Sequence, residues 1–228
     1  MQSRTLRSAS ALLLLVASSS AAAAPQNELS IHLSTLGTPD ADYDMFSENA
    51  NLTSVSLRGG WGFHENISLI GDLSRSRTVS DVYAYGDQDW EEVLIFRSGL
   101  TTYQLGLGLK GRIPIGNLPW LAGYAVGQGV AMTSTVRLDD EPDQEGNPNE
   151  LQYRAMAPGF RVAGGVELLP LRVGFEGRLF TNLEVGYGLV GALNYRDAEA
   201  ETVGEDTALI GDLKFRGVYF AWGMGWRF

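Results

Sequence analysis

The residues suited to catalysis are few, because the chain contains two histidines and no cysteine. His32 and Ser34 lie two positions apart, which places an imidazole and a hydroxyl on the same face of a β-strand. Such a pair is the beginning of a nucleophilic site, but an active site needs several more groups held in fixed positions. His64 lies in a predicted turn, 64–66, where a solvated side chain is the simpler interpretation. The sequence therefore predicts no enzyme and no cofactor.

The most acidic stretch, 138–150, offers oxygen ligands for a cation. Calcium binds six to eight such oxygens, so this stretch is a weak metal candidate. Its spacing does not match the EF-hand loop, and acidic loops are usually just solvated, so we predict no metal site. The candidate ligands are Asp139, Asp140, Asp143 and Glu145, with Glu141 between them.

A third set of residues consists of charges of both signs that recur at alternate positions of predicted strands. The residues that share their face are mainly glycine, alanine and serine, whereas the opposite face is apolar. Small residues with a few charges suit the narrow lumen of a membrane barrel. A lone charge in such an interior is costly, so we expect Arg–Glu and Arg–Asp pairs across the lumen. The predicted lumen charges are Arg58, Asp72, Lys110, Arg112, Arg161, Glu167, Arg172, Glu176, Arg178, Glu184 and Arg227.

These charges need strands to position them, and apolar residues at every second position predict such strands. The predicted strands cover about 28–37, 51–63, 67–79, 93–113, 120–132, 151–168, a segment from 171, and 217–228. In the fifth strand, large and small side chains alternate. We expect the residues with large side chains (the larger set) to face lipid and those with small side chains (the smaller set) to face the lumen. The larger set is Trp120, Ala122, Tyr124, Val126, Val130 and Met132, and the smaller is Gly123, Ala125, Gly127, Gly129 and Ala131. We expect aromatic girdles from Trp61, Trp120, Trp222, Trp226, Tyr103, Tyr124 and Tyr187.

The connections between these strands alternate in length. Short turns are predicted at 64–66, 114–118 and 169–170, and long acidic loops at 38–50, 80–92 and 138–150. This asymmetry is typical of outer-membrane barrels, with tight periplasmic turns and long extracellular loops. Each strand clears the ~9–11 residues that a tilted β-span requires. The sequence predicts an all-β, antiparallel, up-and-down transmembrane β-barrel.

The number of strands depends on the segment 171–228. One long hairpin that projects from the membrane, with its apex near Glu201, gives eight strands. Breaks at Thr181-Asn182 and near Arg216-Gly217 give ten. The apolar residues Leu209, Leu213 and Phe215 are odd-numbered whereas those of the final strand are even-numbered, so we expect a bulge or break near Arg216. We favour eight, because ten would put the acidic stretch 197–206 on the side of the short turns.

The N-terminal segment 1–23 combines Arg4 and Arg7, a short apolar run and small residues, which predicts a cleaved signal peptide and a barrel domain at 24–228. Its removal takes away two positive charges and changes the formal charge from −10 to −12. Such acidity argues against a nucleic-acid partner, because nucleic-acid affinity comes from lysine and arginine. Two lysines, Lys110 and Lys214, are fewer than a soluble surface normally carries.

The final strand resembles the closing strand of bacterial outer-membrane β-barrels, in which the barrel-assembly machinery recognises a terminal Phe and the alternating apolar residues before it. The matching residues are Phe220, Trp222, Met224, Trp226 and Phe228. The chain as a whole resembles the small OmpA/OmpX-type barrels. That resemblance implies a monomer in the outer membrane that contacts lipid and lipopolysaccharide.

Three functional hypotheses follow from that resemblance and from the small lumen. The first is a non-enzymatic structural or surface-interaction barrel with a side-chain-filled lumen and acidic extracellular loops, because eight strands leave an interior that side chains can fill. The second is a narrow, porin-like pore for small solutes or ions. The third is a lipid A-modifying enzyme, since His32-Leu33-Ser34 is superficially similar to the His-x-Ser arrangement of lipid A deacylases, although that family's surrounding motif is missing.

Overall fold

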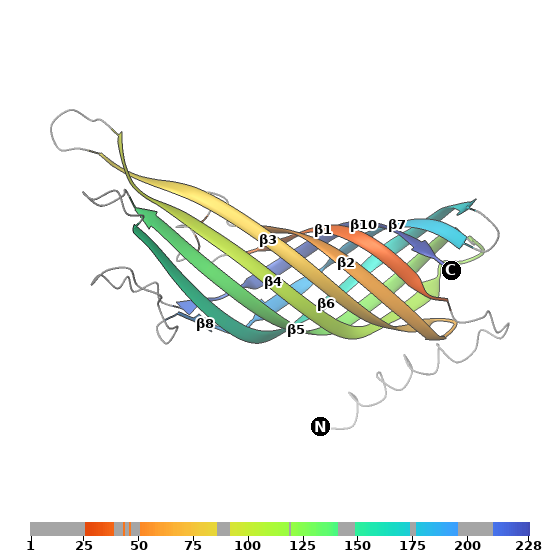
Figure 1. Cartoon of the computed structure of the whole chain (residues 1–228). Coiled ribbons are helices and arrows are strands. Elements are labelled where there is room, and N and C mark those ends of the chain that lie inside the picture. The colour runs from red at the N-terminus through yellow and green to blue at the C-terminus, as the bar shows by residue number, and fades with distance from the viewer. Residues whose placement is uncertain are drawn as a thin grey trace, which may run out of the picture.

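The chain folds into a closed antiparallel β-barrel of eight strands in the order β1-β10-β7-β6-β5-β4-β3-β2 (Figure 1). The computed structural model describes residues 26–38, 43, 46, 51–85, 92–118, 120–140, 149–173, 177–195 and 212–228. The predicted signal peptide, 1–23, lies outside this range. In the described part of the chain, no helix is long and apolar enough to cross a membrane. The prediction of an eight-stranded all-β barrel is confirmed, and the ten-stranded alternative is wrong.

Eight long strands build the wall and two very short ones form a separate pair. The wall strands are β1 (Glu28–Gly37), β2 (Asn51–His64), β3 (Ile67–Tyr85), β4 (Glu92–Pro114), β5 (Leu121–Asp140), β6 (Asn149–Val173), β7 (Gly177–Val190) and β10 (Arg216–Arg227). The additional pair is β8 (Leu193–Asn194) with β9 (Asp212–Leu213).

Pairing of the first and last strands closes the barrel. Glu28 is opposite Arg227, and Leu36 is opposite Tyr219. Two backbone hydrogen bonds of 2.9 Å join Asn27 and Phe228 just beyond the ladder. Figure 1 shows the C-terminus and the start of β1 at the same end of the barrel. The short turns 65–66 and 115–120 also lie at this end, which we therefore call the periplasmic end.

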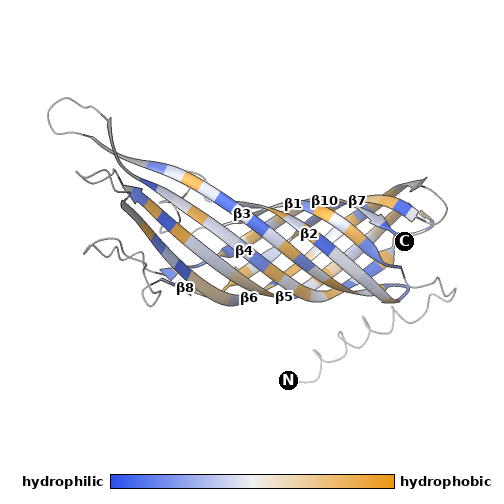
Figure 2. Ribbon diagram, in the orientation of Figure 1, coloured by the Kyte–Doolittle hydropathy of each residue, from blue (hydrophilic) through white to orange (hydrophobic). Residues whose placement is uncertain are grey.

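Side chains alternate between a buried inward face and an exposed, apolar outward face. Along β10, Tyr219 and Ala221 are buried, whereas Val218, Phe220 and Trp222 are about half exposed. Figure 2 shows apolar and polar residues interspersed along the wall strands, and the exposed side chains among them are largely apolar. A soluble barrel buries its apolar face, so this inverted pattern requires lipid around the wall. The structure is that of a transmembrane barrel.

The strand β5 contradicts the predicted direction of its two faces. Tyr124, Val126, Val130 and Met132 point into the lumen, and Tyr124 is only 6% exposed. Gly127 and Gly129 point outward, and a Cβ added to Gly127 would meet no atom within 4 Å. The prediction relied on side-chain size, because neither face of this segment carries a charge that would identify the lumen side. The polar residues Gln128 and Ser134 have the same parity as Tyr124 and face the lumen with it. The smaller set (Gly123, Ala125, Gly127, Gly129 and Ala131) faces outward.

One further detail of the C-terminal third differs from the predictions. The strand β6 continues through Leu169-Pro170 to Val173, with a register shift between Leu168 and Leu171, so the predicted turn at 169–170 is wrong. Beyond β7, Leu193 is opposite Leu213 and Asn194 is opposite Asp212, so the described residues on either side of the undescribed segment pair as the two arms of the predicted hairpin do. Its predicted apex near Glu201 lies outside the described residues.

The predicted break near Arg216 is present, since β9 ends at Leu213 and β10 begins at Arg216. Burial nevertheless alternates without interruption from Leu213 through Phe215 to Tyr219, so the direction of the side chains does not change. What changes is the composition of the lumen, which is apolar beside Leu213 and Phe215.

The wall is uneven in height, because β3–β6 extend beyond the other four strands at the end opposite the termini (Figure 1). The ladder between β2 and β3 stops at Ser54–Ser76, whereas the ladder between β3 and β4 continues to Tyr85–Glu92. The ladder between β6 and β7 stops at Gly159–Val190, although β6 begins ten residues earlier, at Asn149. Above the complete barrel, the four long strands therefore form an open sheet whose inner face needs a cover.

Candidate functional site

The lumen near the periplasmic end contains a group of buried ion pairs. Lys110 Nζ lies 2.7 Å from Glu28 Oε1 and 3.0 Å from Glu167 Oε2. Arg227 bridges the same two carboxylates, at 2.8 Å to Glu28 and 2.7 Å to Glu167. Arg112, which is more exposed, lies 3.2 Å from Glu167. These contacts join β1, β4, β6 and β10 across the lumen.

A second ionic group lies deeper in the barrel. Arg58 donates to Glu184 at 2.8 and 3.3 Å and lies 3.5 Å from Asp72. Arg161 pairs with Asp72, and Gln128 donates to the same carboxylate at 2.9 Å. The Tyr124 hydroxyl donates to Glu184 at 3.2 Å. We call both groups together the ionic layer: Glu28, Arg58, Asp72, Lys110, Arg112, Arg161, Glu167, Glu184 and Arg227.

Inward-facing glycines create the space for these side chains. A Cβ at Gly106 would lie 2.6 Å from Asp72 Oδ1, and a Cβ at Gly223 would lie 2.8 Å from the His32 ring. Both distances are shorter than real Cβ contacts, so a side chain at either position would displace a buried polar group. The glycines on the inner face therefore set where the ionic layer fits.

The structure places the predicted lumen charges unequally. Arg178 is half-buried at the periplasmic rim, opposite Arg227 in the ladder. Only the backbone of Arg172 is described, and Glu176 lies outside the described residues. The predicted charges that join the ionic layer are Arg58, Asp72, Lys110, Arg112, Arg161, Glu167, Glu184 and Arg227.

Three residues of this site did not appear among the predicted lumen residues. Glu28 is buried and pairs with Lys110, 82 residues away in sequence. Its even number, shared with the inward-facing Ser30 and His32, was an available signal. Gln128 was not singled out, and Tyr124 was assigned to the lipid side, because the faces of β5 were predicted in reverse. The placement of Tyr124 in an aromatic girdle is wrong, since its ring lies in the lumen, with Lys110 Nζ 4.9 Å from its centroid.

The remaining predicted girdle residues lie on the outside of the wall, apart from Trp120, which is exposed in the short turn before β5. Trp61 is 62% exposed, and Trp120 and Tyr187 are about half exposed. The C-terminal pattern also faces outward as a row of apolar side chains, and the Trp226 and Phe228 rings lie 5.2 Å apart. The outward members of that row are Phe220, Trp222, Met224, Trp226 and Phe228.

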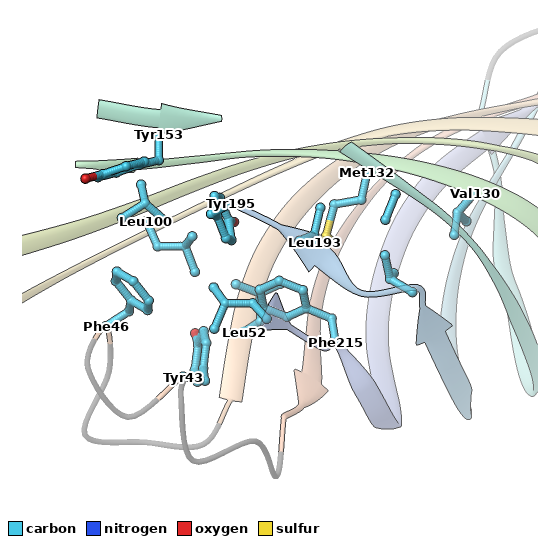
Figure 3. Packing of buried hydrophobic residues seen from close by; sticks show 14 residues of the cluster. Tyr43, Phe46, Leu52, Leu100, Val130, Met132, Tyr153, Leu193, Tyr195 and Phe215 are labelled. Atoms are coloured by element: carbon cyan, nitrogen blue, oxygen red, sulfur yellow. The ribbon is translucent and has the colours of Figure 1, made fainter. Parts of the chain in front are cut away.

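The far end of the lumen is filled by apolar and aromatic side chains (Figure 3). Tyr43 and Phe46 come from the segment between β1 and β2, and the Tyr43 and Phe215 rings contact edge to face at 5.8 Å. Tyr195, beside β8, donates to Ser134 on β5 at 2.5 Å. We call this cluster the apolar cap: Tyr43, Phe46, Leu52, Leu100, Val130, Met132, Val136, Tyr153, Ala157, Val190, Leu193, Tyr195, Leu213 and Phe215.

Little space remains where the two regions meet. Arg161 lies 4.6 Å from the centroid of the Tyr219 ring and so links the ionic layer to the residues below the cap. A cavity of about 30 Å³ borders Ser34, Gln104 and Met132 at this level, which is room for a few waters at most. A second space of about 30 Å³ lies at the periplasmic mouth beside Arg112. A much larger hollow of about 1080 Å³ is lined mainly by outward side chains such as Leu183 and Trp222, so it belongs to the lipid-facing surface.

The residues considered for catalysis are dispersed. His32 is fully buried, and its Nε2 lies 2.9 Å from Ser30 Oγ, whereas Ser34 Oγ lies 2.8 Å from Ser54 Oγ. His64, the last residue of β2, is exposed, and its Nδ1 accepts a hydrogen bond from the Asn66 backbone. The structure therefore does not bring His32 and Ser34 together as a pair.

The weak metal candidates lie at the extended end of β5. Asp139 is exposed there, and the backbone of Asp140 continues the strand. Asp143 and Glu145 lie outside the described residues. Among the residues that the structure does describe, no three His, Asp or Glu side chains are grouped as metal ligands.

Comparison with known proteins gives likenesses of fold alone. No family model matches the sequence, and no curated protein matches it. Among solved structures, the attachment invasion locus protein Ail of Yersinia pestis is 12% identical, with a TM-score of 0.45, over 90% of this chain and 100% of that one. Neisserial surface protein A is 12% identical, with a TM-score of 0.44, over 91% and 97%. The outer membrane protein OprG of Pseudomonas aeruginosa is 10% identical, with a TM-score of 0.45, over 90% and 96%.

Proposed function

We propose that this transmembrane barrel resides in the bacterial outer membrane as a closed, non-enzymatic body that acts through its outer surface and extracellular end. Its role is structural or one of surface interaction, with outer-membrane lipid as the surrounding partner. The observation that carries the proposal is the filled lumen. The ionic layer links opposite sides of the wall in the lower half of the lumen, near the periplasmic end. The apolar cap occupies the upper half, at the opposite end.

Several physical features support closure. A continuous water path would need to pass Arg58 and Glu167, whose side chains are 1% and 0% exposed. Eight strands leave an interior about as wide as the side chains that fill it. The cap above adds large apolar side chains, around which water is disfavoured. A non-enzymatic role is supported by the position of His32, which is shut inside the lumen.

Planar-bilayer conductance tests this proposal. The refolded full chain, inserted in molar potassium chloride, is expected to remain silent, whereas a general porin inserted in the same bilayer gives large steps. Discrete steps of uniform size from the folded protein would contradict closure and favour the narrow-pore alternative. A changed lipid A profile on overexpression would instead favour a lipid-modifying enzyme. Folding itself is checked by a heat-modifiable gel shift and by recovery from the outer-membrane fraction.

A further inference from the structure

The outward surface of the long strands β3–β6 carries a patch of arginines that the closed lumen does not involve. Lower on the same strands, the outward residues are apolar, with Leu73 on β3, Leu105 on β4 and Phe160 on β6 about half exposed or more. Nearer the extended end, they become polar, beginning with Arg75 on β3, Thr101 on β4 and Thr133 on β5. Such a change is what a barrel wall requires where it passes from hydrocarbon to headgroups. The exposed arginines above it are Arg75, Arg77, Arg97, Arg137 and Arg154.

The ladder registers bring these arginines onto neighbouring strands. Arg77 is opposite Thr101, which is opposite Thr135, which is opposite Arg154. Arg137 lies one outward position further along β5, opposite Gly99. A depression of about 360 Å³ runs across these strands, and its lining includes Arg75, Arg77, Arg97, Arg137 and threonine hydroxyls.

The charge of this surface is opposite to that of the chain. The protein as a whole has a formal charge of −10, yet the described outward side chains of β3–β6 include five arginines and only two aspartates, Asp81 and Asp139. Asp81 pairs with Arg97 at 2.6 Å, and this hydrogen bond holds the pKa of the Asp81 carboxyl below its usual range. Arg97 is thus engaged at the outer edge of the patch. Arg75 is packed over the Tyr103 ring at 5.6 Å, which fixes it beside the apolar band.

We propose that Arg75, Arg77, Arg137 and Arg154 bind phosphate groups of lipid headgroups in the outer leaflet. Guanidinium groups pair with phosphate oxygens in bidentate geometry, and neighbouring threonine hydroxyls supply further donors. The patch faces sideways from the wall at the level where such headgroups lie, which favours a lipid over a soluble anion. The inference rests on the proposed outer-membrane location, and it names the partner of that surface.

Binding of lipid A to the folded full chain in zwitterionic detergent tests the patch. The probe is bisphosphorylated lipid A, with dephosphorylated lipid A as its comparison, and binding is followed by native mass spectrometry. The variant R75Q/R77Q/R137Q/R154Q is expected to bind the phosphorylated probe at least about tenfold more weakly than wild type, through loss of charge-assisted hydrogen bonds. The matched control Arg216→Gln removes an exposed outward arginine from β10 and is expected to leave binding unchanged.

Equal binding of the two lipids, or unchanged binding in the fourfold variant, would overturn the proposal. Full displacement of the lipid by millimolar inorganic phosphate would also overturn it, by showing a general anion site. If the fourfold variant lacks the heat-modifiable gel shift, the pairs R75Q/R77Q and R137Q/R154Q are measured separately, each with a several-fold loss expected. Conductance and membrane fractionation of the wild type test the proposed function separately, so the two failures are distinguishable.

Discussion

The two halves of the lumen are filled by side chains of different kinds. The ionic layer fills the half near the periplasmic end with paired charges from seven of the eight wall strands, for example Arg58 against Glu184. The apolar cap fills the upper half with side chains from the wall and from the segments that fold over it, for example Phe46 and Leu193. The lower half is surrounded by a complete wall, whereas the upper half is an open sheet that needs a cover. The apolar cap is therefore a conventional protein core, and the ionic layer is a set of ion pairs that connect wall strands across the lumen.

This contrast predicts different responses to single substitutions. In the ionic layer, removing one charge leaves its buried partner with one ion pair fewer. In the apolar cap, removing methyl groups leaves a cavity. The substitutions below are measured by urea unfolding of the barrel inserted in phospholipid vesicles, with tryptophan fluorescence as the signal and the gel shift as the check of folding.

Among the variants expected to fold, the largest loss is expected for Glu184→Gln in the ionic layer. The substitution leaves Arg58, which is 1% exposed, with only the 3.5 Å contact to Asp72 among its two carboxylate partners. We expect a loss of about 4 kcal/mol in the free energy of unfolding, as for other broken buried pairs. The exposed pair provides the control, because Asp81→Asn is expected to cost less than about 1 kcal/mol.

Removal of both partners sharpens the comparison. In the double variant Arg58→Met/Glu184→Leu, no unpaired charge remains from this pair, and Asp72 keeps Arg161. We expect this variant to recover most of the stability that Glu184→Gln loses, because well-packed apolar side chains can replace a buried ion pair. If the double variant is less stable than the single one, charge compensation is not what the ionic layer provides.

A smaller loss is expected for Leu213→Ala in the apolar cap. Leu213 is fully buried between β8 and the neighbouring cap residues. A Leu→Ala cavity in a packed core costs about 3 kcal/mol, and less where the surroundings can collapse into it. Val218→Ala, an outward position on β10, serves as the apolar control. Equal losses for these two variants would mean that the cap is not a packed core.

The smallest effect is expected for Gly127→Leu on the outer face of β5. Because a Cβ at this position would meet no atom within 4 Å, we expect a change of about 0.5 kcal/mol or less. Gly106→Leu is the inward counterpart, and it is expected to prevent stable folding because its Cβ would collide with Asp72. The reverse order of these two results would contradict the orientation of β5.

Sequence patterns predicted the order and the membrane-spanning part of the wall strands, because alternation of apolar residues is a local property of each segment. They did not predict the extensions, since β3 and β5 continue to Tyr85 and Asp140, beyond their predicted ends at 79 and 132. Strand β1 was predicted at 28–37 and is found at those residues, and the final strand differs by one residue at each end. Alternation failed on β5, where both faces lack charge and side-chain size was taken as evidence of lipid contact. The position of Gln128 indicates the lumen face, but one amide among apolar residues is a weak signal.

The sequence by itself determined an eight-stranded membrane barrel with a charged, small-residue interior. It did so because each strand needs one face for lipid, and that requirement is met within the strand. Only the tertiary structure decided which charges meet, since Lys110 and Glu28 are 82 residues apart. Tertiary structure alone also revealed the apolar cap, because Phe46, Leu193 and Phe215 gather there only when the four long strands rise above the others. Contacts across a lumen depend on the closure and tilt of the whole wall, which no single strand encodes.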